Sequence, residues 1–321
     1  MNRILSFLLL MLLTAPASAQ WYYDDAAIMG TNIEVQVWAS SEAQGQQAIN
    51  AVFEEMERIN QLMSPYIESS ELSQLNAHAA DGAFVVSEEL FSLIRYAIRI
   101  GDMTHGAFDI TFASVGFQYD YRARVRPDDT MIASQLSAIS YQHLELNADT
   151  HAIRYRHPDV KIDLGGIAKG HAVDKSVEKL KSLGIQHAMV TAGGDTRLLG
   201  DRLGRPWLVG IRDPRQEGKQ AVKIPLVSSA ISTSGDYERY FEEDGVRYHH
   251  ILSPSTGKPA SLVQSVSIIG PSSTTNDALS TSVFVMGLTA GLALIDSLPE
   301  VEAIILDNER RMHFSSGLTD N

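Results

Sequence analysis

The order of the predicted strands and helices limits the folds open to this chain more than any other feature of its sequence. Strand patterns occur at 33–37, 187–192, 207–211, 246–252, 263–269 and 301–306, and helical apolar stripes at 43–63, 88–100 and 276–286. Because several of these strands follow one another without an intervening helix, the pattern favours an α+β (mixed α/β) fold over a doubly wound parallel sheet. The 321 residues contain no internal repeat and no low-complexity linker, so we expect one domain.

The middle of the chain has the pattern of a strand, a glycine turn and a helix. An extended run at 160–164 is followed by Gly165-Gly166 and then by a helical stripe that ends at Gly184. A glycine pair in this place lets the backbone approach a ligand closely, and the N-terminus of the helix offers free N–H groups to an anion. Lys169 in the first helical turn is disfavoured by the helix dipole, which a bound phosphate would offset. A tight turn with Lys169 in solvent is an equally good interpretation.

Two oxygen-bearing side chains lie one turn apart at the start of the last long helix. Asp277 and Thr281 would share one face of that helix. A hard cation such as Mg²⁺ takes one or two carboxylates together with neutral oxygens, water or phosphate. Alternatively, Thr274 and Asp277 form a capping box in which Asp277 only satisfies backbone N–H groups. By themselves, the residues favour the capping box.

Two adjacent histidines end a predicted strand just before a turn that contains proline and glycine. The pKa of an ordinary histidine lies near neutral pH, so His249 or His250 can act as a general base. Neighbouring side chains point to opposite faces of a strand, and only one of the two can face a given site. A separate glycine turn at 106–111 carries Asp109 between apolar residues and by itself indicates a loop with a helix cap.

The charge and the cysteine content exclude several kinds of site. A formal net charge of −13 argues against a non-specific nucleic-acid binder, which needs a basic surface. The chain contains no cysteine, and this excludes disulfides, thiolate nucleophiles, zinc–thiolate sites and iron–sulfur clusters. Any metal must therefore bind to oxygen or imidazole ligands.

The N-terminus has the pattern of a secretory signal peptide at 1–19. Arg3 gives a positive start, residues 4–13 form an apolar run, and Ala17-Ser18-Ala19 matches a cleavage site. We expect cleavage before Gln20 and export to a bacterial periplasm. No cysteine follows the apolar run, so a lipid-anchored form is excluded. No later stretch reaches the roughly 18 apolar residues of a membrane span.

Eight short blocks occur along the chain in a specific order, although each is a weak signal alone. They are Met29-Gly30-Thr31, 63–66 with 70–76, 106–109, 163–170, Gly193-Gly194-Asp195, 233–237, 250–254 and 277–281. In this order they closely resemble the FAD:protein FMN transferase family, often called ApbE-type flavin transferases, over nearly the whole mature chain. The resemblance implies a single ApbE-like flavin transferase domain at 20–321, with mixed or antiparallel sheets flanked by helices.

The resemblance also implies a reaction and a set of site residues. Family members use Mg²⁺, split the pyrophosphate of FAD, attach FMN to a threonine of a partner protein and release AMP. By motif match, Asp277 and Thr281 are side-chain ligands of the metal, and Gly166 provides its backbone carbonyl. His250 matches the catalytic histidine, which takes the proton of the threonine hydroxyl. The positions that match contacts to FAD are Met29, Tyr66, Ala107, Phe108, Asp109, Asp163, Lys169 and Ile251.

Chemistry supports several of these matches, and one block departs from the family. Tyr66 and Phe108 suit packing on flat rings, and Lys169 suits a pyrophosphate. The block after the histidine often reads Asp-Pro in the family, whereas this chain has Ser253-Pro254, which puts in doubt a role for a carboxylate there.

The expected partner is an acceptor protein with a target threonine, a subunit of a membrane redox complex or another exported flavoprotein. Three alternatives stay open from the sequence. One is an FAD pyrophosphatase, in which water replaces threonine and FMN and AMP are released. The others are a periplasmic flavin-binding protein without catalysis and a conventional redox flavoenzyme.

Overall fold

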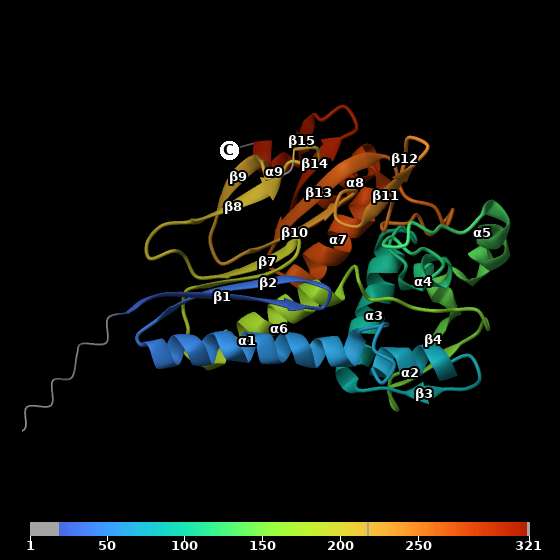
Figure 1. Ribbon diagram of the computed structural model, residues 1–321, viewed down its shortest axis with the longest axis horizontal. Coiled ribbons are helices and arrows are strands. Elements are labelled where there is room, and N and C mark those ends of the chain that lie inside the picture. The colour runs from blue at the N-terminus through green and yellow to red at the C-terminus, as the bar shows by residue number, and fades with distance from the viewer. Residues whose placement is uncertain (1–18, 217, 320–321) are drawn as a thin grey trace, which may run out of the picture.

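An eight-stranded sheet runs through the protein (Figure 1). The computed structural model describes residues 19–216 and 218–319, so residues 1–18 of the expected signal peptide lie outside it. In spatial order the strands are β1 (Gln20–Ile28), β2 (Thr31–Ala39), β6 (Ala188–Ala192), β7 (Asp195–Leu199), β10 (Ala230–Gly235), β13 (Val263–Gly270), β14 (Glu302–Asp307) and β15 (Met312–Phe314). All neighbouring pairs in this sheet are antiparallel, which confirms the predicted α+β fold.

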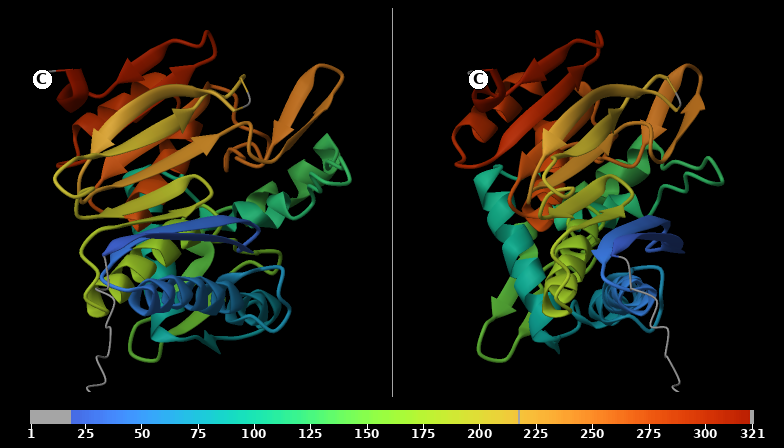
Figure 2. Two further views of the ribbon diagram at one scale, coloured as in Figure 1. Left: turned by 60° about the vertical axis from the view of Figure 1, so that its left-hand side comes forward. Right: turned by 90° about the vertical axis from the view of Figure 1, so that its left-hand side faces the viewer.

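Helices and three smaller sheets surround the large sheet. The helices are α1 (Glu42–Met63), α2 (Glu71–His78), α3 (Glu88–Met103), α4 (Ala113–Gly116), α5 (Asp129–Gln135), α6 (Ala168–Ser182), α7 (Ser273–Met286), α8 (Leu288–Asp296) and α9 (Ser316–Thr319). The smaller sheets are β3 (Phe84–Val85) with β5 (Ala152–Tyr155) and β4 (Leu144–Asn147), β8 (Trp207–Arg212) with β9 (Gln220–Leu226), and β11 (Tyr240–Glu243) with β12 (Val246–His249). The β11–β12 hairpin projects from the body of the molecule (Figure 2).

Different helices cover the two ends of the large sheet. α1 and α6 pack on β1, β2, β6 and β7, where Val35 and Val190 are fully buried. α7 and α8 pack on β10, β13 and β14, where Val266 and Ile305 are fully buried. Since α6 also packs on α7, these two helices meet over the middle of the sheet. No helix in the described part of the chain is long and apolar enough to cross a membrane.

The structure confirms the predicted helices and most predicted strands, but it changes three details. The helix predicted at 88–100, for which Gly101 is the expected stop, continues to Met103, and a Cβ atom on Gly101 would lie 3.0 Å from the carbonyl oxygen of Phe108. Glycine is thus placed there for close packing rather than for helix termination. The extended run 160–164 belongs to no sheet. The strand predicted at 246–252 ends at His249, before the backbone turns.

Candidate active site

Three elements bring charged groups together where α6 meets α7. Lys169 comes from the first turn of α6, Asp195 from the start of β7 and Asp277 from the second turn of α7. The Nζ atom of Lys169 lies 2.9 Å from Oδ2 of Asp195 and 3.4 Å from Oδ2 of Asp277. The backbone N–H of Gly170 also donates to Oδ2 of Asp277, at 3.0 Å. Asp277 thus contacts the helix that follows the Gly165-Gly166 turn.

Thr281 lies beside the same glycine turn. A Cβ atom added to Gly166 would be 3.3 Å from Oγ1 of Thr281 and 3.2 Å from Cε2 of Phe108. Ser234, near the end of β10, places its Oγ atom 3.2 Å from Oγ1 of Thr281. Among the described residues, no N–H or O–H group donates to the carbonyl oxygen of Gly166. The three residues matched to metal ligands, Asp277, Thr281 and Gly166, therefore lie around one turn.

The capping-box interpretation of Asp277 is wrong. α7 begins at Ser273, and its N-cap is Ser272 rather than Thr274. The N–H groups of Ser273 and Thr274 donate to Asp174 of α6, at 3.0 and 2.9 Å. Because the first turn of α7 has these partners, the carboxylate of Asp277 is not needed as a cap and contacts α6 instead.

We expect the substitution Gly170→Ala to disturb the contact between α6 and α7. A Cβ atom on Gly170 would clash with the carbonyl oxygen of Ser273 and lie 2.8 Å from Cβ of Asp277. Overpacking of this kind typically lowers the free energy of unfolding by about 1–3 kcal/mol. The clash cannot be relieved by a side-chain rotation, because the nearest atom belongs to the backbone of Ser273. Urea unfolding should show this loss of stability. Gly82→Ala is the control, because no atom lies within 4 Å of an added Cβ there; equal stability of the two variants would contradict the prediction.

Two buried carboxylates share one ammonium group in this cluster. The side chains of Asp195 and Asp277 are only 3% and 4% exposed. Burial alone would lower the pKa of Lys169, but the charges of Asp195 and then Asp277 outweigh it and raise that pKa. Burial, and then the charge of Asp195, raises the pKa of Asp277. The cluster has more negative than positive charge, which a divalent cation would neutralise.

The oxygen atoms of the site suit a hard cation. They include the carboxylate of Asp277, the hydroxyl of Thr281 and the carbonyl of Gly166, to which no described group donates. Mg²⁺ is usually held by one or two carboxylates and keeps water or phosphate oxygens as its other ligands. In the described ranges, no cluster of three or more histidine, aspartate or glutamate side chains could hold a metal. A cation bound here would therefore depend on neutral oxygens and on the substrate.

The two adjacent histidines have different surroundings. The ring of His249 packs edge-on against Phe284, and its Nε2 lies 2.7 Å from the carbonyl oxygen of Ala260. The backbone N–H of His250 donates to the carbonyl of Arg239. The buried ring atom Nδ1 of His250 has no hydrogen-bond partner in the part of the chain that the structure describes. Burial, and then the charge of Arg239, lowers the pKa of His250 to about 3. His250 is thus neutral near neutral pH, with a ring nitrogen free to accept a proton.

The low pKa of His250 also predicts how stability depends on pH. The unfolded chain protonates this imidazole below pH 6.5, whereas the folded protein keeps it neutral down to about pH 3. The contribution of His250 to the free energy of unfolding is therefore fully present above pH 6.5. It is lost as the pH falls from 6.5 to about 3, with a slope that approaches about 1.4 kcal/mol per pH unit. We expect His250→Gln to show a shallower decline in urea unfolding between pH 7 and pH 4. Identical slopes would contradict the burial of a neutral imidazole.

Several residues matched to FAD contacts lie near Arg239. Its Nη2 atom is 3.4 Å from the carbonyl oxygen of Gly30, which follows Met29. Asp163 accepts a hydrogen bond of 2.5 Å from the N–H of Gly165. Burial raises the pKa of Asp163, and this hydrogen bond and the charge of Arg239 oppose the rise. Tyr66 is 76% exposed, so its ring is free to stack on a flat ligand.

The turn at 106–111 places Phe108 next to the site and uses Asp109 within the fold. Phe108 is 4% exposed, and its Cε2 atom would lie 3.2 Å from a Cβ atom added to Gly166. The carboxylate of Asp109 accepts from the N–H and hydroxyl of Thr111 and from the N–H of Tyr141, at 2.6–2.8 Å. Asp109 therefore caps the short helix at 110–112, as the sequence predicts, and it shapes the turn. Ala107 precedes Phe108 on this turn, and Ile251 is buried directly after His250.

Three residues at the site were not identified from the sequence as site residues: Asp195, Ser234 and Arg239. Asp195 follows the pair Gly193-Gly194, and a buried acid after two glycines is a signal that could have revealed it. Ser234 lies in the block 233–237. Arg239 has no local signal, because only the folded chain brings it near Gly30 and His250.

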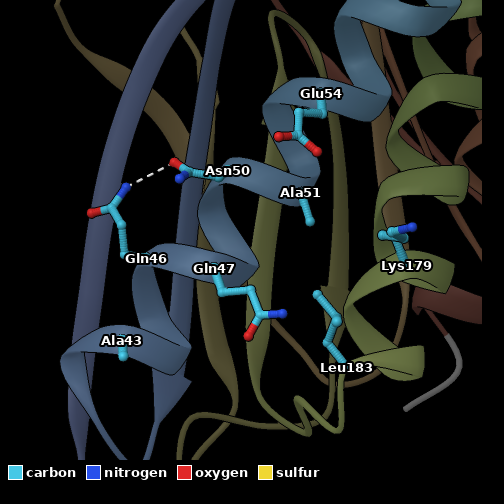
Figure 3. A pocket seen from close by; sticks show the side chains of 8 residues that line it. All are labelled: Ala43, Gln46, Gln47, Asn50, Ala51, Glu54, Lys179 and Leu183. Carbon is cyan, nitrogen blue, oxygen red and sulfur yellow. Dashed lines mark hydrogen bonds between the residues drawn. The ribbon is translucent and has the colours of Figure 1, made fainter.

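A hollow of about 630 Å³ lies elsewhere, between α1 and α6 (Figure 3). It is lined by Ala43, Gln46, Gln47, Asn50, Ala51, Glu54, Lys179 and Leu183. None of the residues matched to the metal or to FAD lines it, so it is separate from the candidate site.

Comparisons with known proteins agree with this fold and show the family. Residues 29–305 match the model of the ApbE family. A FAD:protein FMN transferase of Treponema pallidum is 34% identical over 316 residues, which cover 91% of this chain and 86% of the relative. A FAD:protein FMN transferase of Vibrio cholerae is 36% identical over 270 residues, which cover 81% of this chain and 80% of the relative.

Solved structures show the same architecture. The structure of the ApbE protein of Thermotoga maritima superimposes with a TM-score of 0.87 and 36% identity, covering 94% of this chain and 98% of that one. The flavin transferase ApbE from Vibrio cholerae gives a TM-score of 0.83 and 30% identity, covering 94% and 99%. The match spans most of the chain in sequence and in structure, and the chain therefore belongs to the ApbE family.

Proposed function

We propose that this protein is a Mg²⁺-dependent FAD:protein FMN transferase. It splits the pyrophosphate of FAD, joins FMN through a phosphoester bond to a threonine of an acceptor protein, and releases AMP. The observation that carries the proposal is the placement of Asp277 and Thr281 beside the Gly165-Gly166 turn, with Lys169 at the same point. The names of its relatives as FAD:protein FMN transferases support it.

The metal ligands in this proposal are Asp277, Thr281 and the carbonyl of Gly166. When bound, the ion supplies positive charge that stabilises the pyrophosphate oxygens as the bond at phosphorus breaks. Lys169 binds the same pyrophosphate, and Asp195 keeps its ammonium group in place at 2.9 Å. The exposed ring of Tyr66 and the buried ring of Phe108 suit packing against the flat parts of FAD.

His250 acts as the general base in this proposal. Its neutral imidazole takes the proton of the threonine hydroxyl while that oxygen attacks the phosphorus next to riboflavin. A new oxygen–phosphorus bond forms, the pyrophosphate bond breaks, and the bridging oxygen leaves with AMP. A pKa of about 3 makes the free imidazole a weak base. The negative charge of the bound pyrophosphate would raise this pKa and strengthen the base.

We also propose that the protein acts in a bacterial periplasm after cleavage of residues 1–19. The signal pattern of the sequence supports this location. The acceptor would then be a subunit of a membrane redox complex or another exported flavoprotein.

Incubation with FAD, Mg²⁺ and a threonine-containing acceptor tests the proposal. After denaturing electrophoresis, a fluorescent acceptor band together with free AMP is the expected result. Free FMN and AMP without a labelled acceptor would instead indicate an FAD pyrophosphatase. Unchanged FAD that stays bound to the protein would indicate a flavin-binding protein without catalysis.

A further inference from the structure

The first turns of α6 and α7 are capped by carboxylates from each other. Asp277 of α7 accepts from the N–H of Gly170 in the first turn of α6. In return, Asp174 of α6 accepts from the N–H groups of Ser273 and Thr274 in the first turn of α7. The N–H groups at a helix start have no partner within the helix, so each carboxylate fixes the position of the other helix.

Asp174 has a dense set of donors. Besides the two N–H groups, the hydroxyls of Ser272 and Thr274 donate to its Oδ2, each at 2.8 Å. The side chain lies 3.1 Å from Nη1 of Arg197 and is 18% exposed. A carboxylate with five donors is held in one orientation and in turn orders the start of α7.

Arg197 extends this contact to a third element. It lies on β7, two residues after Asp195. The same Nη1 atom also donates to the carbonyl of Pro271, in the loop that leads into α7. The pair Asp174–Arg197 thus joins α6, β7 and α7, the three elements that carry Lys169, Asp195 and Asp277.

We propose that Asp174 is a positioning residue for the metal and pyrophosphate site. It touches none of the groups assigned to the metal or to FAD, but it sets the distance between the start of α6 and the start of α7. That distance decides whether Asp277 and Thr281 meet the carbonyl of Gly166. This inference rests on the proposed function, because it concerns the same metal site.

The main test compares Asp174→Ala with Asp128→Ala. Asp128 caps α5 through the N–H of Met131, at 2.8 Å, and α5 carries no residue of the site. Calorimetric titration with Mg²⁺ should show a dissociation constant about 10–100-fold higher in Asp174→Ala, as is typical when support for a metal ligand is lost. Hydrogen exchange should also be faster at the backbone amide of Gly170, whose N–H donates to the carboxylate of Asp277. Asp128→Ala should keep wild-type values in both measurements.

A second pair of variants covers the case in which Asp174→Ala does not fold. Thr274→Val removes one hydroxyl donor to Asp174, and Thr275→Val removes the neighbouring hydroxyl contact to Tyr96 at 2.8 Å. We expect faster exchange at Gly170 and weaker Mg²⁺ binding in Thr274→Val only.

Two results would overturn the proposal. One is a folded Asp174→Ala protein with wild-type Mg²⁺ affinity and wild-type exchange at Gly170. The other, if that variant is unfolded, is identical behaviour of Thr274→Val and Thr275→Val. A wild-type protein that transfers no FMN would reject the proposed function instead, and exchange at Gly170 would still decide whether Asp174 orders this junction.

Discussion

Asp277→Ala is expected to abolish Mg²⁺-dependent transfer of FMN while the protein stays folded. The substitution removes the only charged group among the three proposed metal ligands, and the two neutral oxygens that remain would hold Mg²⁺ weakly. The rate should fall at least about 10³-fold, the scale of several kcal/mol of charge stabilisation. Transfer at saturating FAD, measured over a range of Mg²⁺ concentrations, checks this.

Stability should respond differently from activity in this variant. Burial and the charge of Asp195 already disfavour the ionised carboxylate of Asp277. Its removal relieves that repulsion and leaves Lys169 paired with Asp195. Because the N–H of Gly170 also loses its acceptor, we expect the melting temperature to fall only modestly, by far less than transfer falls. Asp307→Ala, in β14, is a control that removes a different buried aspartate and should keep Mg²⁺-dependent transfer.

His250→Ala is expected to slow transfer by about 10²–10⁴-fold with little change in the binding of FAD. A general base lowers the barrier of the chemical step, and it does not strengthen the binding of the substrate. Single-turnover transfer measured beside an FAD-binding titration separates the two effects. The neighbouring variant His249→Ala is the matched control. It removes the contact to Phe284 and the hydrogen bond with Ala260, so it should lower the melting temperature more than His250→Ala does. A His250→Ala protein with wild-type transfer would remove His250 from the reaction.

Local periodicity accounts for the part of the fold that could be predicted. The apolar stripe of α1 and the alternation of β2 follow directly from their buried faces. β1 is not predicted because it is an edge strand without a fully buried residue and with two adjacent aspartates, so its sequence shows no alternation. The order of the strands could not be predicted, since β7 pairs with β10 and β6 with β2 across long stretches of chain.

The candidate site shows the same limit more sharply. The sequence places Asp277 in a capping box, where it would accept from the first N–H groups of its own helix. Only the folded protein shows that Asp174, about a hundred residues away, accepts from these N–H groups instead. The choice between His249 and His250 likewise depends on Ala260 and Arg239, which are distant from the strand pattern. The order of the eight sequence blocks identifies the family, whereas the partners of each residue come from packing.

Anomalous diffraction from crystals of the protein with FAD and Mn²⁺ tests the central claim most directly. The claim is that Asp277, Thr281 and the carbonyl of Gly166 hold a divalent cation against the pyrophosphate. We expect one anomalous peak within about 2.0–2.4 Å of these three oxygens, next to the pyrophosphate and Lys169. A peak at other residues, or FAD bound with no peak beside Asp277, would contradict the account.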